Sequence, residues 1–334
     1  MNDFLEIPAV KAVVLGGREP NYLTPLTAKE NAAFRNYIFG LDISDIRPGT
    51  YLRTFVLAPL LLKITAEGSR YLDIGGFDGI LSRIVQKHTG NKPLVLDLDW
   101  EGLRKLKNTG VQPLKASAVV LPFVDNCMYV IWALDLLEHL DKPAESLKEI
   151  ERVLKPGGKC LITTPVKGRY WGLPESEMLA LHKKWGHIYP GFSEDEITGL
   201  FVEAGLEVSE VSGYFCEITG RIYHHIYVSG SFNLDEKTAF KVWKSTVENI
   251  ETGLPGQPIE YVVIARKPAK GEMPAKNKVS APEYGISQDM SLTVKPPRTA
   301  VSDWIRDLTG EYREKKAIMP EKTKELIDAV SATI

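Results

Sequence analysis

Several features that mark whole classes of protein are scarce or missing in this chain of 334 residues. It has only three cysteines, which lie far apart and lack the spacing of a metal site: Cys127, Cys160 and Cys216. We expect buried thiols in a reducing compartment. No apolar run reaches the ~20 residues that cross a bilayer, and the amino-terminal residues lack a secretory signal pattern. These absences predict a soluble, cytoplasmic protein with no transmembrane segment and no metal site.

Charge of either sign is not in excess, because 41 basic residues face 43 acidic ones. A nucleic-acid-binding protein normally carries a basic face or a basic domain. We therefore expect no nucleic-acid partner.

The dinucleotide fingerprint G-x-G-x-x-G is also missing, yet a glycine-rich turn is present at residues 70–79. A short apolar run with an acid at Asp73 leads into glycines 75, 76 and 79, and residues 80–88 follow with helical periodicity. This order predicts strand, tight turn and helix, with unpaired backbone N–H groups at the start of the helix. The turn either binds a nucleotide or is purely structural.

A second apolar strand is expected at residues 94–98, with acids about 20 residues after the glycine turn. At that position a carboxylate accepts both hydroxyls of an adenosine ribose; Asp97 is the better candidate and Asp99 the reserve. Asp73 would repel a pyrophosphate but suits a cationic ligand, such as the amino group of S-adenosylmethionine.

Strand and helix patterns alternate regularly from residue 70 onwards. Such alternation predicts parallel strands with right-handed crossovers, in a sheet covered on both faces, with the ligand at its carboxyl edge. The expected strands are residues 70–74, 94–98, 111–115, 128–134, 159–164, 206–211 and 259–266; the expected helices between them are 79–88, 100–108 and 143–153. Residues 156–158, Pro-Gly-Gly, predict a helix stop and turn. Residues 193–196, Ser-Glu-Asp-Glu, predict the cap of a further helix that runs to residue 204.

Four ordered motifs resemble those of the class I S-adenosylmethionine-dependent methyltransferases, especially the group related to the ubiquinone-biosynthesis methyltransferases. They are the turn at 73–79, Leu121-Pro-Phe123 before Asp125-Asn126, Leu137-Glu-His-Leu140, and Arg152-Val-Leu-Lys-Pro-Gly-Gly158. The resemblance is close over residues 70 to about 165 and loose to 267. It implies a doubly wound, Rossmann-like α/β fold with a seven-stranded sheet and helices on both faces.

The resemblance also implies the cofactor S-adenosyl-L-methionine and a set of residues that contact it: Asp73, Gly75, Gly76, Phe77, Gly79, Asp97, Leu98, Ser117, Ala118 and Asp135. The chain departs from the family pattern in three places. Phe77 stands where the middle glycine is usual, Ser117 stands where many relatives have an acid, and Met128-Tyr129 replaces a Phe-Asp pair. A hydroxyl at Ser117 still has a donor and an acceptor for the adenine edge.

A base is needed only if the acceptor must lose a proton, and His139 is the first candidate for that role. The alternative for His139 is a structural hydrogen bond at a helix start. Weaker candidates for the acceptor side are His187, Tyr189, His224 and His225.

We expect three regions: an N-terminal helical extension at 1–68, the S-adenosylmethionine-binding domain at 69–267, and a linker with a C-terminal helical tail at 268–334. The extension should hold one helix at 27–37 and another in the apolar stretch 51–64, bent or divided at Pro59. That stretch packs on the sheet edge, covers the cofactor as a lid, or forms a surface that meets lipid. Within the domain, insertions at 166–192 and 215–257 are expected on the acceptor side, the second carrying a helix at 235–251. The alternative for the second insertion is an added helical layer or a dimer contact.

The favoured function is methyl transfer from S-adenosylmethionine to an O, N or C atom of a small metabolite, sugar or lipid-linked acceptor. Two alternatives stay open: a non-catalytic regulatory or scaffold protein that keeps the fold, and a nicotinamide-dependent oxidoreductase, against which the missing fingerprint argues. The tail offers a contact for a homo-oligomer or another partner.

Overall fold

The computed structural model describes residues 48–65, 70–230 and 258–269, together with 239, 240, 243 and 247. The chain divides into two compact units. Of the described residues, 48–65, 70–168, 179–212 and 260–269 belong to the first unit. The second unit comprises 169–178, 213–230, 258, 259 and the four single residues 239, 240, 243 and 247.

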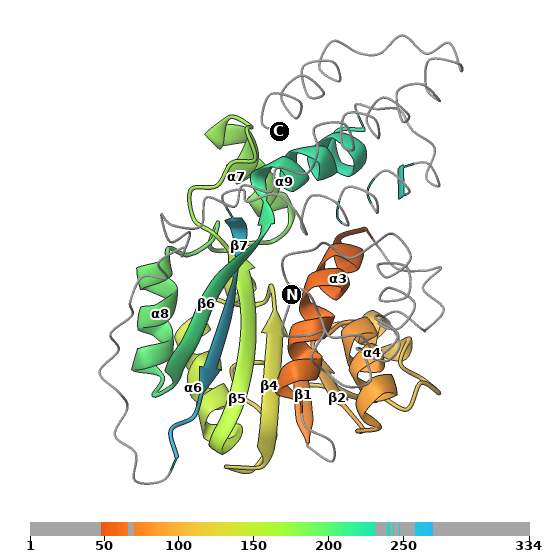
Figure 1. Cartoon of the computed structure of the whole chain (residues 1–334), viewed down its shortest axis with the longest axis vertical. Coiled ribbons are helices and arrows are strands. Elements are labelled where there is room, and N and C mark those ends of the chain that lie inside the picture. The colour runs from red at the N-terminus through yellow and green to blue at the C-terminus, as the bar shows by residue number, and fades with distance from the viewer. Residues whose placement is uncertain are drawn as a thin grey trace, which may run out of the picture. The chain divides into compact units, whose positions relative to one another are not determined.

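A seven-stranded sheet with the order β3-β2-β1-β4-β5-β7-β6 forms the framework (Figure 1). Its first five strands are parallel, and β7 runs antiparallel to β5. The strands are β1 Tyr71–Ile74, β2 Leu94–Asp97, β3 Gln112–Lys115, β4 Met128–Leu134, β5 Leu154–Pro165, β6 Glu207–Cys216 and β7 Pro258–Arg266. The predicted seven-stranded α/β sheet is thus confirmed.

The order of the strands reverses between β1 and β4, which are neighbours in the sheet. From β1 the chain crosses to β2 on one side, and from β4 it crosses to β5 on the other. Right-handed crossovers in opposite directions place the connecting helices α4 (Ile80–Thr89) and α6 (Pro143–Val153) on opposite faces. Ligands of such folds bind at the carboxyl edge beside this reversal.

The centre of the sheet is apolar on both sides, as expected for parallel strands between helices. Every residue of β1 is buried, and the ring of Tyr71 stacks on that of Trp132 in β4 with centroids 4.8 Å apart. The main core cluster joins β1, β4, β5 and β7 to α6 and to α8 (Glu194–Glu203). Ser193 and Glu196 form a reciprocal capping box at the start of α8, which confirms the predicted cap.

Three elements differ clearly in length from the sequence prediction. The strand predicted at 206–211 is the longer β6, Glu207–Cys216. The helix predicted over 100–108 is α5, Trp100–Arg104, because the following residues form tighter i to i+3 turns and Asn108 takes a left-handed conformation. The strand predicted at 159–164 is β5, Leu154–Pro165. Helix α6 does stop at Val153, but residues 156–158 form a bulge in β5: the pairing with β4 passes from Met128↔Leu154 directly to Val130↔Lys159.

Helix α3, Pro48–Ile64, is the described part of the N-terminal extension. It is one continuous helix through Pro59, so the predicted division at that residue is wrong. Tyr51, Leu57 and Leu61 are fully buried, and α3 packs against α4 (Figure 1). Arg53 of α3 forms an ion pair with Asp135, which follows β4 at the carboxyl edge of the sheet.

The second unit has an aromatic core of its own. Phe215 lies 5.7 Å from the ring of Trp171 and 6.2 Å from the ring of Trp243. Arg221 donates a hydrogen bond from Nε to the Trp171 carbonyl oxygen at 3.2 Å. Arg221 belongs to α9 (Glu217–Tyr223), which continues as the π-helix η3 (His224–Val228).

The helix predicted at 235–251 is confirmed at the four residues of that range that the structure describes. Residues 239, 240, 243 and 247 are helical, and Ala239, Trp243 and Val247 are buried at a spacing of four. The predicted helix at 27–37 and the tail beyond 269 lie outside the described residues. The remaining α-helix of the described residues is α7, Glu175–Lys184. None of the described helices combines the length and the apolar character required to cross a membrane.

Candidate functional site

The glycine turn leaves β1 at the switch point and folds tightly against its own strand. A Cβ on Gly76 would lie 2.5 Å from the Asp73 carboxyl carbon, so only glycine fits there. Gly79 takes φ +61° as the N-cap of α4, and a Cβ there would meet the Leu106 side chain at 2.6 Å. The turn therefore holds the start of α4, with its free N–H groups, close to the ends of β1 and β2.

Phe77, which stands where the middle glycine is usual in the family resembled, takes the left-handed backbone conformation that glycine favours. Its φ is +46°, a conformation that costs a non-glycine residue roughly 1–2 kcal/mol. Its ring packs over Gly102 of α5 with Lys105 Nζ 5.4 Å from the ring centroid, and its backbone N–H donates to Asp97 Oδ2 at 2.9 Å. The backbone N–H of Phe77 is thereby committed to the protein.

The two acids after β2 have different roles. Asp97 Oδ1 accepts a hydrogen bond from the Asp99 backbone N–H at 2.8 Å, so both Asp97 oxygens are oriented while each keeps a lone pair for a ligand. Asp99 instead caps α5 by accepting from the Glu101 N–H at 2.8 Å. The preference for Asp97 over Asp99 therefore has a structural reason.

Asp73 is buried in β1 beneath the turn. Ser82 of α4 donates a hydrogen bond from its hydroxyl to Asp73 Oδ2 at 2.8 Å. Burial raises the pKa of Asp73 to about 7, although the Ser82 hydrogen bond opposes that rise. A buried carboxyl of this kind strongly favours a cationic neighbour.

Residues expected around an adenine ring follow β2 and β3. The side chain of Leu98 is 62% exposed, which is unusual for leucine beside a sheet. Ser117 Oγ accepts from the Val119 N–H at 3.3 Å, and Ser117 pairs with Val120 in an isolated antiparallel bridge. Ala118 between them is buried.

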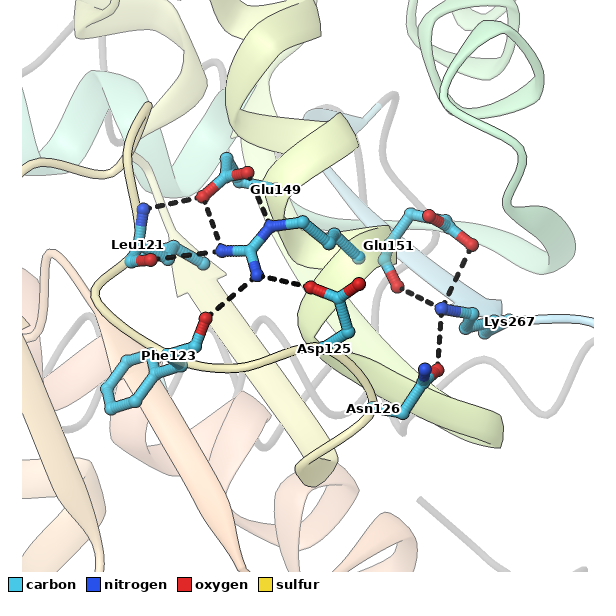
Figure 2. Close-up of polar contacts among 8 residues, drawn as sticks. Leu121, Phe123, Asp125, Asn126, Glu149, Glu151 and Lys267 are labelled. Atoms are coloured by element: carbon cyan, nitrogen blue, oxygen red, sulfur yellow. Dashed lines mark hydrogen bonds and ion pairs between the residues drawn. The ribbon is translucent and has the colours of Figure 1, made fainter.

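The loop that follows Ala118 is fastened by two side chains of α6, Glu149 and Arg152 (Figure 2). Glu149 Oε2 accepts a hydrogen bond from the Leu121 backbone N–H at 2.7 Å, and Arg152 lies near the end of the helix. The Arg152 guanidinium donates to the carbonyl oxygens of Leu121 and Phe123 at 3.0 and 2.8 Å. It also binds Glu149 through Nε at 2.7 Å and Nη2 at 2.9 Å, and Asp125 at 2.7 Å. Two motifs that are distant in sequence, 121–126 and 152–158, thus meet in one polar cluster.

Arg152→Leu is expected to lower the free energy of unfolding by about 2 kcal/mol or more, because it removes charged hydrogen bonds and leaves carbonyl groups without a donor. Urea denaturation measures this change. The matched control is Arg104→Leu, because Arg104 is 60% exposed and forms its ion pair with Glu101, which is exposed too; a surface pair contributes at most about 1 kcal/mol. Equal losses in the two variants would contradict a structural role for the Arg152 cluster.

Asp135 follows β4 directly across the switch point from the glycine turn. It adopts φ +48° and accepts a hydrogen bond from the Thr163 hydroxyl, while its own N–H donates to Thr163 Oγ1 at 2.9 Å. Asp135 Oδ2 forms an ion pair with Arg53 of α3. The N-terminal helix therefore supplies a cation to the ligand edge of the sheet.

Two further acids lie near Asp135 and are buried. Glu138 belongs to the short 3-10 helix η2 (Leu137–His139), and Glu260 belongs to β7. Burial raises the pKa of both carboxyls well above the usual range, and Asp135 adds to the rise while Arg53 opposes it. The carboxyl groups of Asp135, Glu138 and Glu260 thus all interact electrostatically with Arg53, and Asp135 also forms an ion pair with it.

His139 lies beside a second imidazole. Its Nδ1 is 3.2 Å from the Gly186 carbonyl oxygen, and its ring centroid is 4.5 Å from that of His187. His187 Nδ1 is 2.9 Å from His182 Nδ1. Burial lowers the pKa of His187 to about 3, and the nearby His139 and His182 add to the effect.

The structure brings most of the predicted residues to one edge. Asp73, Gly75, Gly76, Phe77 and Gly79 lie at the β1 end, and Asp97 and Leu98 follow β2. Ser117 and Ala118 follow β3, and Asp135 and His139 follow β4. Tyr189 donates its hydroxyl to the Asp141 carbonyl oxygen at 3.4 Å. His224 and His225 belong to the second unit, where His224 lies 3.5 Å from Glu177.

Sequence reasoning missed Arg53, Glu260 and His182. Nothing local marks Arg53 or Glu260, because each acts across more than 80 residues of chain on Asp135. For His182 a signal existed: it stands five residues before His187, in the last turn of α7, just ahead of the loop that carries His187 and Tyr189.

A family model described as a methyltransferase domain matches residues 72–162. The matched span begins in β1 and ends in β5. It contains every residue predicted to contact the cofactor, and His139.

Among known proteins, the ubiquinone/menaquinone biosynthesis C-methyltransferase UbiE of Blochmanniella floridana is 34% identical over 125 residues, which is 34% of this chain and 47% of that protein. The glycine/sarcosine/dimethylglycine N-methyltransferase of Actinopolyspora halophila is 26% identical, over 52% of this chain and 34% of that protein. The chain spans about half the length of the first curated relatives it matches. The structure of geranyl diphosphate C-methyltransferase from Streptomyces coelicolor A3(2) is 13% identical, covers 64% of this chain and 76% of its own, and superimposes with a TM-score of 0.48.

Proposed function

Because residues 72–162 belong to the class I S-adenosylmethionine-dependent methyltransferases, we propose that this protein transfers a methyl group from S-adenosylmethionine to an O, N or C atom of a small-metabolite, sugar or lipid-linked acceptor. One observation carries the proposal. The glycine turn after β1 and the carboxylate of Asp97 after β2 are joined by the hydrogen bond from the Phe77 N–H, so they form one binding surface.

In the proposed complex, Asp97 accepts hydrogen bonds from the ribose hydroxyls, and Leu98 and Ala118 contact the adenine ring with Ser117 at its edge. The glycines of the turn, Gly75, Gly76 and Gly79, let the cofactor approach the backbone closely. Asp73 lies on the side of the cationic amino group, whose charge stabilises the buried carboxylate. Asp135 lies between the methionine end and the acceptor.

Methyl transfer is an in-line displacement, in which an electron pair of the acceptor attacks the methyl carbon while the carbon–sulfur bond breaks. The sulfonium becomes the neutral thioether S-adenosylhomocysteine, and an acceptor that carried a proton must lose it. His139 assists that loss, since the unprotonated nitrogen of a neutral imidazole accepts a proton from a positioned acceptor.

In this proposal, the regions outside the seven-stranded sheet serve the acceptor and assembly. Residues 1–68 are an N-terminal extension, 69–267 the methyltransferase domain with acceptor-side insertions at 166–192 and 215–257, and 268–334 a linker and tail for a homo-oligomer or other partner contact. Cytoplasmic location is part of the proposal: Cys127 and Cys160 are thiols outside any disulfide, as expected in a reducing compartment.

Incubating the protein with S-adenosylmethionine and a panel of sugar, lipid-linked and small-metabolite acceptors is expected to yield S-adenosylhomocysteine with at least one acceptor class. His139→Ala should lower kcat by about 10²-fold or more with an acceptor that must lose a proton, and leave cofactor affinity unchanged. Cofactor binding measured by calorimetry is the companion readout. A full rate in His139→Ala would remove His139 from the proposed mechanism, and binding without any turnover would favour the regulatory alternative.

A further inference from the structure

Three potential metal ligands meet beside the carboxyl end of β4. Glu138 and His139 come from η2, and His187 comes from the loop after α7. One ligand atom of each lies within 4.8 Å of one ligand atom of each other residue. Small side-chain rotations bring such atoms to the ~2.0–2.2 Å distances of a zinc site.

The carboxyl group of Glu138 has an unused oxygen. Glu138 is fully buried, and Oε1 accepts no hydrogen bond from the residues that the structure describes. Thr164 donates to the other oxygen, Oε2, at 3.3 Å. A buried carboxyl oxygen without a partner is costly and calls for a donor or a cation.

Both imidazoles are held in orientations that leave a nitrogen lone pair. A carbonyl oxygen only accepts, so the contact with Gly186 O places the proton of His139 on Nδ1 and leaves the lone pair on Nε2. His187 contacts His182 through Nδ1 at 2.9 Å, and its other nitrogen is then the ligand. A metal-bound histidine typically has a second residue on its other nitrogen, as His182 is here.

We propose that Glu138, His139 and His187 bind one divalent metal ion of the zinc type, with His182 positioning His187. One carboxylate and two imidazoles form a ligand set that zinc uses where it keeps a further position open for water or substrate. Asp135 and Glu260 add two further carboxyl groups beside the cluster, and a bound cation stabilises the ionised form of a carboxyl group.

Metal binding at this site does not depend on methyl transfer. Its use in the reaction does rest on the proposed function: an acceptor hydroxyl on the open position loses its proton more readily, because the metal stabilises the oxygen anion. With the metal bound, His139 assists proton loss as a ligand of the metal, in place of accepting the proton itself. If the metal takes part in the reaction, chelators abolish turnover but leave binding of S-adenosylmethionine intact. If the protein has no methyltransferase activity, the proposed function fails, yet zinc binding at this site is still expected.

The test is calorimetric titration of the tag-free, chelator-treated full-length protein with zinc chloride, and the expected result is one equivalent bound. Glu138→Gln and His187→Gln, which remove a ligand while retaining similar side-chain volume, should each weaken zinc binding by at least about 10²-fold, and His182→Gln by roughly 10- to 100-fold. His88→Gln, a histidine of α4 outside the cluster, should bind zinc as the wild type does.

Thermal melts of the metal-free variants identify any variant that fails to fold. If only one of Glu138→Gln and His187→Gln folds, that variant alone is compared with the wild type for zinc affinity. Two results would overturn the proposal: absence of zinc binding by the wild type, or equal zinc affinity in the wild type and a folded ligand variant. Loss of binding in His88→Gln to the same extent as in Glu138→Gln would also overturn it, because the zinc would then occupy another site.

Discussion

Asp97→Ala is expected to weaken S-adenosylmethionine binding by about 10²-fold. The substitution removes the acceptor of two ribose hydroxyl groups, and a hydrogen bond to a charged group contributes about 1.5–3 kcal/mol, each 1.4 kcal/mol being tenfold in affinity. It also frees the Phe77 N–H, which holds the glycine turn. Calorimetric titration of the variant with the cofactor measures the loss.

Asp99→Ala is the matched control, because it removes an acid two residues away. Within the described part of the chain, Asp99 accepts only the Glu101 N–H, as the cap of α5. Its loss should therefore cost about 1 kcal/mol of stability and leave cofactor affinity unchanged. If Asp99→Ala weakened binding as much as Asp97→Ala, the assignment of the ribose to Asp97 would be wrong.

Cofactor affinity should also depend on pH through Asp73. Burial raises the pKa of this carboxyl to about 7 in the free protein, and a bound amino group would favour its charged form. Below pH 7 binding must therefore release a proton, so affinity is expected to fall by up to tenfold per pH unit. Above about pH 8 the ligand amino group loses its own charge, so affinity should be highest between about pH 7 and 8.

As the pH rises towards 7, the free energy of unfolding of the free protein should fall, whereas cofactor affinity rises. Because the folded pKa of Asp73 lies above the unfolded value of 3.8, the folded state binds more protons in this window, and stability falls as the pH rises from about 4 to 7. Asp78 and Asp97 face the same carboxyl and raise its pKa further, whereas the Ser82 hydroxyl lowers it.

Asp73→Asn is expected to flatten the acid side of the affinity profile and to weaken binding at pH 7.5, since the amide lacks the charge. Titrations at several pH values between 5.5 and 8 measure both effects. A wild-type profile that is flat between pH 5.5 and 7, or an unchanged slope in Asp73→Asn, would show that Asp73 does not face the cofactor charge.

Local patterns were sufficient to predict the framework. The apolar run at 71–74, the glycines after it and the acid at 97 each have a short-range cause: buried strand, steric demand at Gly76, and a carboxylate at a strand end. The capping box at Ser193 is likewise local, and the structure confirms it. These features depend on neighbours in sequence, so the sequence displays them.

The rest depends on contacts that only the folded chain creates. Arg53 meets Asp135 because α3 packs on α4 beside the switch point, a relation without any local signal. Glu260 becomes part of the acidic edge because β7 inserts antiparallel between β5 and β6. Residues 156–158 are typical of a turn, but pairing with β4 incorporates them in β5 as a bulge.

Titration of the purified wild-type protein with S-adenosylmethionine at pH 7.5 tests the central claim most directly. The account predicts saturable binding at one site, weakened in Asp97→Ala and retained in Asp99→Ala. Absence of any binding to the folded wild type would contradict it, because the turn after β1 and the acid after β2 would then form no cofactor site.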